Sequence, residues 1–462
     1  MADFKNIYFV GIGGIGMSAL ARHFKAIGYN VAGYDRTRTA LTNEIEAEGI
    51  AITFDDKVEA IPQLFCDKEQ TKIVFTPAVP ADNNILTNFR TNGFDIVKRS
   101  AMLGELTSQS DAICIAGTHG KTTTSTLVAH ILRNSSVGCS AFLGGISNNY
   151  NTNYWSNVNS KFVVTEADEY DRSFLALHPY LSLITAMDAD HLDIYGTKNE
   201  VIKAFKQYAS QTTIGGSLVC KLGLPITTDD IDEDVELFTY SATDSDADFF
   251  AFGIKLSGDR YHFSVSTPFG IIRDVTLGVP GRHNIENAVA AIALAMLAGA
   301  EEDEVRNALK TFTGNRRRFQ YRIEDKRFVM IDDYAHHPAE ISTMLNSVRE
   351  MYGNRKVTVV FQPHLYTRTR DFAPEFAKAL SLADRILLLD IYPARELPIE
   401  GVSSQMLAKL MTKADVQLTT KETLVADILQ HPLDVLIMMG AGNIDAMVPM
   451  VEEKIKELLK VQ

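Results

Sequence analysis

The stretch Ala116-Gly117-Thr118-His119-Gly120-Lys121-Thr122-Thr123 follows an apolar run, Asp111–Ile115, and leads into a helical pattern. Glycines let a backbone approach phosphate, and the N-terminus of a helix offers N–H donors. The lysine reaches the terminal phosphates, and the next hydroxyl can ligate Mg²⁺. We therefore predict a loop that binds a nucleoside triphosphate, formed by Gly117, Thr118, His119, Gly120, Lys121, Thr122 and Thr123.

The spacing of this loop is unusual, because only Thr118 and His119 separate the two glycines where the common form has four residues. The departure narrows the family to which the chain can belong. A plain turn between a strand and a helix, with an exposed lysine, is the alternative interpretation.

Length and charge limit the possibilities. A chain of 462 residues is too long for one hydrophobic core and suggests about three domains. Lys plus Arg number 45 against 58 Asp plus Glu, and there is no long basic run, so we expect no nucleic acid and no membrane among the partners. The four cysteines lack C-x-x-C spacing and are predicted to be free structural thiols.

The chain begins without the layout of a signal peptide, and its longest apolar helical stretch, 288–300, is too short to span a bilayer. These features favour a cytoplasmic protein.

The pattern along the chain predicts an α/β protein of three domains, each built on a mainly parallel sheet. Residues 1–105 open with a βαβ unit and form a Rossmann-like domain. Residues 106–315 form a central P-loop domain, to which alternating segments between 249 and 279 add an antiparallel meander. Residues 316–462 repeat an apolar run followed by a polar loop four times, which is typical of another Rossmann-like sheet.

The first βαβ unit carries a second glycine loop, Gly11-x-Gly13-Gly14-Ile15-Gly16, and Asp35 ends its second strand. A nicotinamide dinucleotide, with Asp35 on the ribose, is one interpretation. A UDP-linked substrate is equally compatible with the loop, and we rank it higher because a triphosphate loop follows downstream. Packing glycines alone are the third alternative.

Carboxylates follow two buried strands of the central domain. Glu166 begins the run Glu166-Ala-Asp-Glu169, and His191 ends the run Met187-Asp-Ala-Asp-His191. Parallel strands end at one edge of a sheet, so these groups should lie beside the triphosphate, where Thr122 and Glu166 suit Mg²⁺. A solvated acidic turn and a structural histidine are the alternatives.

Three further motifs have polar side chains suited to ligands. Asn284 precedes a helix expected at 285–297 and suits an adenine edge, or it is simply the N-cap. The arginines at 316–318 suit phosphate, or form a solvated patch. The loops 332–338 and 362–370 each follow a strand, and their donors suit a carboxylate, although surface loops rich in arginine are common.

All these motifs occur in one order: Gly11-x-Gly-Gly-x-Gly16-Met-Ser, Gly117-Thr-His-Gly-Lys-Thr-Thr, Glu166-Ala-Asp-Glu, Asp190-His191, Gly281-x-His-Asn284, Arg317-Arg-Phe, Asp333-Tyr-x-His-His-Pro and Gln362-Pro-His. In this the whole chain resembles the Mur ligases of peptidoglycan synthesis. The resemblance implies a UDP-binding domain, a central ATPase domain and a domain that brings the amino acid. It also implies that the lactyl carboxylate of UDP-N-acetylmuramate is activated by ATP as an acyl phosphate, which the amine of L-alanine then attacks.

The resemblance further implies roles for single residues. Lys121, Glu166 and His191 would be catalytic, with Mg²⁺ on Thr122, Glu166 and His191. Asn284, Arg317 and Asp333 would contact ATP, and His336, His364 and Arg368 would contact alanine. The UDP-sugar would be bound by Gly11, Gly13, Gly14, Ile15, Gly16, Asp35, Thr76 and Arg99.

Two departures from the family pattern affect these roles. Leu365 stands where many relatives have an arginine, which removes one donor to the carboxylate of the amino acid. Relatives with longer acceptors use a carbamylated lysine downstream of the Asp-His pair, and either Phe205 or Lys206 occupies that position here. A ligase that recycles murein tripeptide, a nicotinamide dehydrogenase and an ATP-switched UDP-sugar sensor stay open, as does the choice between a monomer and a weak homodimer.

Overall fold

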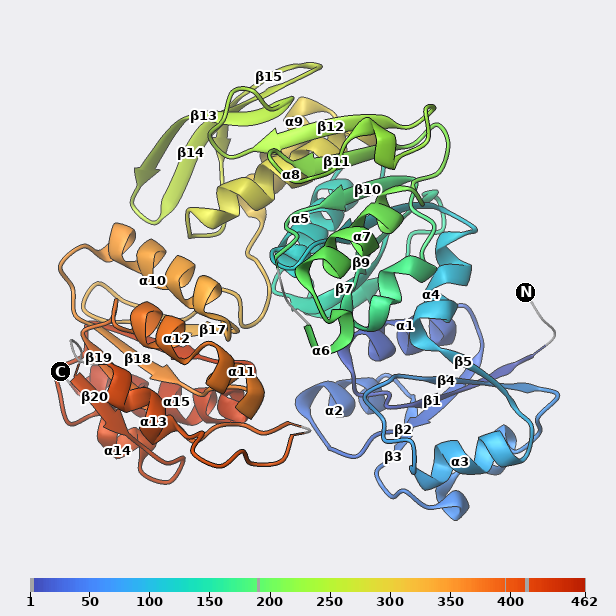
Figure 1. Ribbon diagram of the computed structural model, residues 1–462, viewed down its shortest axis with the longest axis horizontal. Helices are drawn as coiled ribbons and strands as arrows, with labels where there is room; N and C mark the ends of the chain where they lie inside the picture. The colour runs from blue at the N-terminus through green and yellow to red at the C-terminus, as the bar shows by residue number, and fades with distance from the viewer. Residues whose placement is uncertain (1–3, 189–191, 395, 412–414, 462) are drawn as a thin grey trace. The chain divides into compact units, whose positions relative to one another are not determined.

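The computed structural model describes residues 4–188, 192–394, 396–411 and 415–461. It contains three sheets, one in each third of the chain (Figure 1), which confirms the predicted three-part α/β class. By its internal contacts the chain forms two compact units. Unit 1 comprises Met1–Ile254, His262–Leu277 and Glu286–Thr313, and unit 2 comprises Lys255–Tyr261, Gly278–Ile285 and Gly314–Gln462. The first two sheets thus belong mainly to unit 1 and the third to unit 2.

The first sheet is wholly parallel, with the strand order β3-β2-β1-β4-β5. Its strands are β1 (Asn6–Val10), β2 (Asn30–Tyr34), β3 (Ala51–Thr53), β4 (Thr71–Phe75) and β5 (Asp95–Lys98). Its helices are α1 (Ile15–Ala26), α2 (Ala40–Ala47), η1 (Val58–Ala60), η2 (Gln63–Phe65), α3 (Asn84–Thr91) and α4 (Arg99–Thr107). Val10 pairs with Tyr34 and with Phe75, so the loops after β1, β2 and β4 leave the sheet at one edge.

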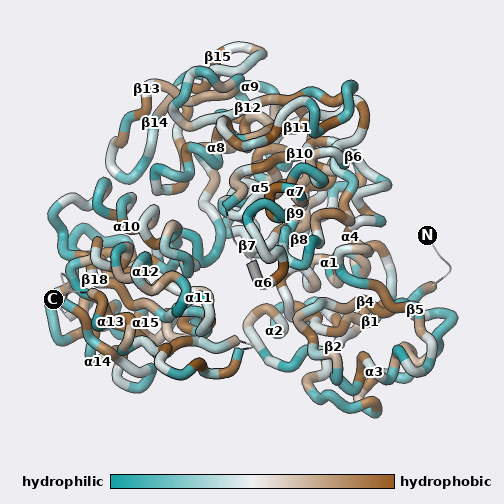
Figure 2. Tube along the Cα trace, viewed as in Figure 1, coloured by the Kyte–Doolittle hydropathy of each residue, from teal (hydrophilic) through white to brown (hydrophobic). Residues whose placement is uncertain are grey.

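The strands of this sheet are buried on both faces, as their continuous apolar runs require. On one face, β1 packs with α1 in a core cluster that includes Phe9, Leu20 and Phe24. On the other, Tyr8 packs with Leu86 and Phe89 of α3. Figure 2 shows hydrophobic residues running along β1 and β4.

The central sheet has the order β15-β14-β13-β12-β11-β10-β6-β9-β7-β8. Its strands are β6 (Asp111–Ala116), β7 (Ser140–Ser147), β8 (Thr152–Trp155), β9 (Phe162–Ala167), β10 (Leu181–Ile184), β11 (Ser217–Lys221), β12 (Glu236–Ser241), β13 (Phe249–Ser257), β14 (Arg260–Thr267) and β15 (Gly270–Thr276). Seven neighbouring strands, β13-β12-β11-β10-β6-β9-β7, pair in parallel. At one end of the sheet β14 and β15 pair antiparallel, as the predicted meander requires, and at the other end β8 is antiparallel to β7.

The helices of the central part are α5 (Lys121–Arg133), η3 (Tyr170–Ala176), α6 (Leu192–Tyr195), α7 (Lys198–Ala209), η4 (Thr228–Asp230), α8 (His283–Leu297) and α9 (Glu302–Thr311). Ala116 at the end of β6 pairs with Ala167 of β9 and with Ile184 of β10. The loops that follow β6, β9 and β10 therefore emerge together, which positions the predicted phosphate loop beside the predicted carboxylates.

The third sheet has the order β16-β17-β21-β18-β19-β20 and is parallel except for the edge strand β16. Its strands are β16 (Gln320–Glu324), β17 (Val329–Asp333), β18 (Val357–Phe361), β19 (Arg385–Leu388), β20 (Asp415–Leu418) and β21 (Val435–Met439). One face packs against α10 (Pro338–Tyr352), α12 (Ala373–Leu380) and α13 (Ser404–Leu410). The other packs against α14 (Leu424–Ile428), η5 (Asn443–Met447) and α15 (Val448–Val461), and α11 (Tyr366–Asp371) follows β18.

All four cysteines are free, as predicted. Cys66 is exposed, and the other three are buried. Among the described residues, no helix combines the length and the apolar character needed to cross a bilayer.

Candidate functional site

The glycine loop after β1 is held by the residues predicted to act with it. Gly11 has φ +90, and a Cβ there would lie 2.6 Å from the methyl group of Thr76. A Cβ on Gly16 would lie 2.7 Å from a guanidinium nitrogen of Arg99. The N–H of Gly13 donates to the Asp35 carboxylate at 2.8 Å. Asp35 thus anchors the loop itself, and its predicted contact with a ligand stays a prediction.

A pocket of about 260 Å³ lies on this loop. Its lining comes from the part of unit 1 that contains the first sheet and from the part that contains the central sheet. The lining residues are Gly14, Ile15, Gly16, Met17, Ala19, Leu20, Thr76, Arg99, Leu103, Phe142, Leu143, Gly144, Thr165, Glu166 and Asp168. Arg99 donates to Asp168 at 3.4 Å across the pocket. The structure therefore brings five of the predicted UDP-sugar residues together with the predicted metal ligand Glu166.

The loop after β6 has the backbone of a phosphate-binding turn. Gly117 has φ +132, and a Cβ there would lie 2.0 Å from Thr185 Oγ1, so a larger residue has no room. Gly120, with φ +81, directly precedes α5. Thr185 Oγ1 donates to the His119 carbonyl at 2.5 Å, and the N–H of Asp188 donates to Thr118 Oγ1 at 3.2 Å. The loop after β10 thus supports the loop after β6.

Lys121 stands at the first position of α5 and is held inside the loop. Its Nζ donates to the Gly117 carbonyl at 2.7 Å and lies 2.9 and 2.7 Å from the two carboxylate oxygens of Glu169. Burial opposes the charge of Lys121, but the carboxylates of Glu169 and Asp168 outweigh it and raise the pKa of the ammonium group above its ordinary value. Lys121 is therefore cationic at neutral pH, as a phosphate ligand must be.

Glu166 lies in a close-fitting cradle. The N–H of Gly144 donates to its Oε1 at 3.0 Å, Ser125 Oγ is 3.3 Å from the same oxygen, and a Cβ on Gly144 would lie 2.3 Å from both oxygens. Ser125 Oγ also donates to the Thr122 carbonyl at 3.1 Å, so Ser125 connects the first turn of α5 with Glu166. The oxygen donors of Thr122 and Glu166 fit a hard divalent cation such as Mg²⁺.

The predicted metal ligand His191 lies outside the described residues. Within the described ranges, no three His, Cys, Asp or Glu side chains gather closely enough to hold a metal ion. A Mg²⁺ ion held here would take its remaining ligands from hydroxyl, water and phosphate oxygens, which is the usual situation for this ion.

In unit 2, Asn284 lies inside the first turn of α8, which begins at His283. Its amide donates to the Pro280 carbonyl at 2.6 Å, so the N-cap alternative is wrong. Asp333 accepts from the N–H groups of Phe319 and Ala335 at 2.7 and 2.8 Å. This carboxylate shapes the turn that carries Arg317.

Arg317 has φ +59 and donates to the Gly440 carbonyl at 2.5 Å. Its guanidinium also lies 3.8 Å from the buried Asp332 and 5.0 Å from the ring centre of Tyr334. Burial raises the pKa of Asp332 to about 7, although the charge of Arg317 opposes that rise. The arginine is thus fixed by its own domain and is not a solvated patch.

The three residues predicted to bind the amino acid lie near one another. The rings of His336 and His364 are 6.0 Å apart, and the ring of His364 stacks on Tyr392 at 5.8 Å. Burial lowers the pKa of His336 to about 4; Glu340 opposes this shift, and the nearby Arg368 adds to it. The Leu365 backbone has φ +71, a strained conformation for leucine, directly beside this cluster.

Sequence reasoning did not assign several residues of this site. Glu169 and Asp168 belong to the motif Glu166-Ala-Asp168-Glu169, and their closeness to Glu166 in the sequence is the signal that could have identified them. Gly144, Ser125 and Tyr392 gave no local signal, because they meet the site only through the fold.

Together these features define a class of protein: an α/β enzyme with a P-loop for a nucleoside triphosphate and a second glycine loop on an adjoining pocket. Three family models match successive parts of the chain: the Mur ligase family catalytic domain over residues 6–111, the Mur ligase middle domain over 115–295 and the Mur ligase glutamate ligase domain over 317–442. The chain belongs to the Mur ligase family.

Individual relatives agree with this assignment. The chain is 48% identical to the UDP-N-acetylmuramate–L-alanine ligase of Porphyromonas gingivalis, covering 98% of this chain and 100% of that protein. It is 45% identical to the enzyme of the same name from Flavobacterium johnsoniae, covering 98% of each. The crystal structure of the UDP-N-acetylmuramate–alanine ligase MurC of Thermotoga maritima matches with a TM-score of 0.83 at 28% identity, covering 98% of this chain and 99% of that one.

A murein peptide ligase from Psychrobacter arcticus shares the fold, with a TM-score of 0.72 at 21% identity over 96% of this chain and 98% of that one. Because the family consists of ligases, the dehydrogenase and sensor alternatives no longer apply.

Proposed function

We propose that this enzyme joins L-alanine to the lactyl carboxylate of UDP-N-acetylmuramate, with cleavage of ATP to ADP and phosphate, in the synthesis of peptidoglycan precursors. Relatives of that name align with the chain over nearly its whole length at 48% and 45% identity. One observation carries the structural side of the proposal: Gly14–Gly16 and Arg99 share a pocket with Glu166. A substrate anchored on the first loop by its diphosphate can thus extend its acid toward the triphosphate loop.

The chemistry has two steps. A carboxylate oxygen of the sugar acid attacks the γ-phosphorus of ATP, and ADP leaves. The neutral amine of alanine then attacks the acyl carbon, phosphate departs, and the nitrogen releases one of its two protons to solvent to give the amide. Both steps bring anions together, so positioning and charge neutralisation supply the catalysis.

The residues of unit 1 suit this task. Lys121 would leave Glu169 and donate to the terminal phosphates, while the N–H groups from Gly117 to Thr123 surround the triphosphate. Thr122, Glu166 and His191 would hold Mg²⁺, which supplies charge neutralisation on the phosphates when bound. Arg99 and the loop from Gly11 to Gly16, with Thr76 and Asp35, would hold the UDP-sugar.

In unit 2, Asn284 would read adenine, and Arg317 with Asp333 would contact the ribose or the phosphates. His336, His364 and Arg368 would hold the alanine carboxylate. The Nδ1–H of His336 donates to the Tyr334 carbonyl at 3.0 Å, so His336 would donate to the alanine carboxylate from Nε2 only in its protonated state. By this proposal, residues 1–105 bind the UDP-sugar, residues 106–315 bind ATP, and residues 316–462 present the amino acid. We further propose a cytoplasmic enzyme that is a monomer or a weak homodimer.

A product assay tests the function. The purified enzyme is incubated with ATP, Mg²⁺, UDP-N-acetylmuramate and an equimolar mixture of amino acids, and the nucleotide products are identified by mass spectrometry. The expected product is the alanyl adduct, with one ADP formed for each amide. A product formed only when a murein tripeptide replaces the amino acids would instead identify a recycling ligase. The absence of ADP with both the amino acids and the tripeptide would refute the proposal.

A further inference from the structure

A buried asparagine of the central part of unit 1 holds the first turn of α1. Asn153 lies on β8 and is 0% exposed. Its Nδ2 donates to the Ile15 carbonyl at 2.6 Å and to Ser18 Oγ at 2.9 Å. Ser18 Oγ donates in turn to the same Ile15 carbonyl at 2.8 Å. The three groups close a small hydrogen-bonded ring at the start of the helix.

This turn carries the donors of the first glycine loop. Gly14 is the N-cap of α1 and has no side chain to cap the first N–H groups of the helix. The residues that carry these groups, Ile15, Gly16 and Met17, line the pocket. A hydrogen bond to phosphate tolerates only a few tenths of an ångström in length. A contact that fixes the Ile15 carbonyl therefore also fixes the N–H groups of the same helical turn.

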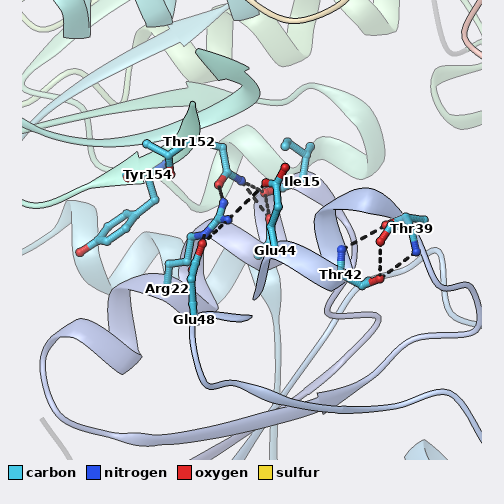
Figure 3. Close-up of polar contacts among 10 residues, drawn as sticks. Ile15, Arg22, Thr39, Thr42, Glu44, Glu48, Thr152 and Tyr154 are labelled. Atoms are coloured by element: carbon cyan, nitrogen blue, oxygen red, sulfur yellow. Dashed lines mark hydrogen bonds and ion pairs between the residues drawn. The ribbon is translucent and has the colours of Figure 1, made fainter. Parts of the chain in front are cut away.

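Asn153 also makes a second connection, to Arg22 in the next turn of α1. The Arg22 guanidinium is 6% exposed, donates to Asn153 Oδ1, and pairs with Glu48 at 2.6 Å and with Glu44 at 3.7 Å (Figure 3). These carboxylates balance the charge of Arg22 within the first domain. Asn153 therefore adds neutral hydrogen bonds that orient the helix, and it does not add an electrostatic attraction for the ligand.

The same hairpin reaches the candidate metal ligand. β8 pairs with β7, where Phe142 lies opposite Tyr154, and β7 carries Gly144, whose N–H donates to Glu166. One hairpin thus contacts both the turn beside the first glycine loop and the carboxylate beside the triphosphate loop.

We infer that Asn153 is a positioning residue for the nucleotide sugar: it sets the place of the α1 N–H donors relative to the carboxylate-activating centre. The inference rests on the proposed function for the identity of the ligand. It assigns to a residue outside the glycine motif a specific effect on the affinity for the UDP-sugar.

Three variants separate this role from general packing. Asn153→Ala removes all its side-chain hydrogen bonds, and Asn153→Asp keeps an acceptor for Arg22 but loses both donors to the first turn. Ser18→Ala removes one corner of the ring with the least disturbance. Tyr154→Phe is the matched control, because the adjacent Tyr154 hydroxyl hydrogen-bonds α1 at His23, 3.0 Å away and beyond the first turn.

The dissociation constant of UDP-N-acetylmuramate is measured by calorimetry without ATP, and the KM values of all three substrates are measured in the complete reaction. We expect a rise of about tenfold in the dissociation constant and KM of the UDP-sugar for both Asn153 variants, which corresponds to about 1.4 kcal/mol. Ser18→Ala should give a smaller rise of about threefold, worth about 0.7 kcal/mol. The KM of ATP should stay within about twofold, and Tyr154→Phe should change neither constant.

The inference is overturned if the UDP-sugar constants of the Asn153 variants stay within about twofold of wild type, or if the KM of ATP rises equally. An equal rise in Tyr154→Phe would also overturn it, since the interface as a whole would then be responsible. If the Asn153 variants do not fold, Ser18→Ala decides by the same criteria. A wild-type enzyme that neither binds UDP-N-acetylmuramate nor consumes it in the complete reaction would refute the proposed function, a result distinct from each of these.

Discussion

Replacing Glu169 with glutamine is expected to destabilise the nucleotide-free enzyme and to tighten its binding of ATP. Glu169 is 2% exposed, and both of its carboxylate oxygens lie within 2.9 Å of Lys121 Nζ. Removing one partner of a buried ion pair costs about 3–5 kcal/mol, because the other charge is left without compensation. The Gly117 carbonyl still accepts from Lys121 at 2.7 Å, so we expect a loss near the lower end, about 3 kcal/mol.

The nucleotide-bound enzyme should lose less stability from the same substitution. A triphosphate in the loop accepts the hydrogen bonds of Lys121 in place of residue 169, and the neutral glutamine does not repel the phosphates as the carboxylate does. If the bound form loses only half as much stability, the thermodynamic cycle requires that nucleotide binding strengthen by the difference of about 1.5 kcal/mol, or about tenfold.

Urea unfolding with and without a non-hydrolysable ATP analogue and Mg²⁺ measures the two stabilities, and calorimetry measures the affinity. Glu200→Gln serves as the control, because it breaks a pair of similar length, 2.6 Å to Lys203, on the exposed surface of α7. It should change neither quantity. The reasoning is refuted if Glu169→Gln weakens binding of the analogue. It is also refuted if the stability loss of the double variant Glu169→Gln/Lys121→Met equals the sum of the losses of the two single variants.

Three other changes test separate parts of the structure. Gly144→Ala should lower kcat by about 10- to 100-fold and raise the Mg²⁺ requirement, because the new Cβ would lie 2.3 Å from the Glu166 carboxylate; initial rates over a Mg²⁺ series check this, and an unchanged requirement would contradict it. Burial lowers the pKa of His130 to about 4, below the value of about 6.5 in the unfolded chain, so its contribution to stability is present above pH 6.5 and is lost as the pH falls toward 4. We expect wild type to lose about 2 kcal/mol more than His130→Gln between pH 7 and pH 5 in urea unfolding, and parallel losses would argue against it. Gly442→Ala should raise the KM of L-alanine by about tenfold without changing that of the UDP-sugar, because its Cβ would lie 2.7 Å from that of Tyr392, whose ring stacks on the histidine proposed to bind alanine.

Much of the fold could be predicted because its strands are buried on both faces. The runs that became β6, β10, β17 and β21 are continuous and apolar, and each precedes a polar loop. The edge strand β20 was missed, because its residues Asp415–Leu418 are only partly buried and contain no apolar run.

The candidate site divides in the same way. The triphosphate loop is local, so its glycines and Lys121 could be identified from eight consecutive residues. Glu169 pairs with a lysine 48 positions away, and Asn153 meets Ile15 across 138 positions. Such contacts depend on which strands become neighbours in a sheet, and a single sequence contains no pattern that reports it.

The position downstream of the Asp-His pair illustrates what the structure adds. Phe205 is fully buried on α7 and packs edge-on against Phe174, so it belongs to the core. Lys206 points elsewhere: its Nζ donates to both carboxylate oxygens of Asp230, at 3.0 and 3.1 Å. Neither residue is therefore arranged to serve as a carbamylated ligand. We expect no carbamate carbon signal in the ¹³C NMR spectrum of the native wild-type enzyme equilibrated with ¹³C-labelled bicarbonate, and such a signal would contradict this expectation.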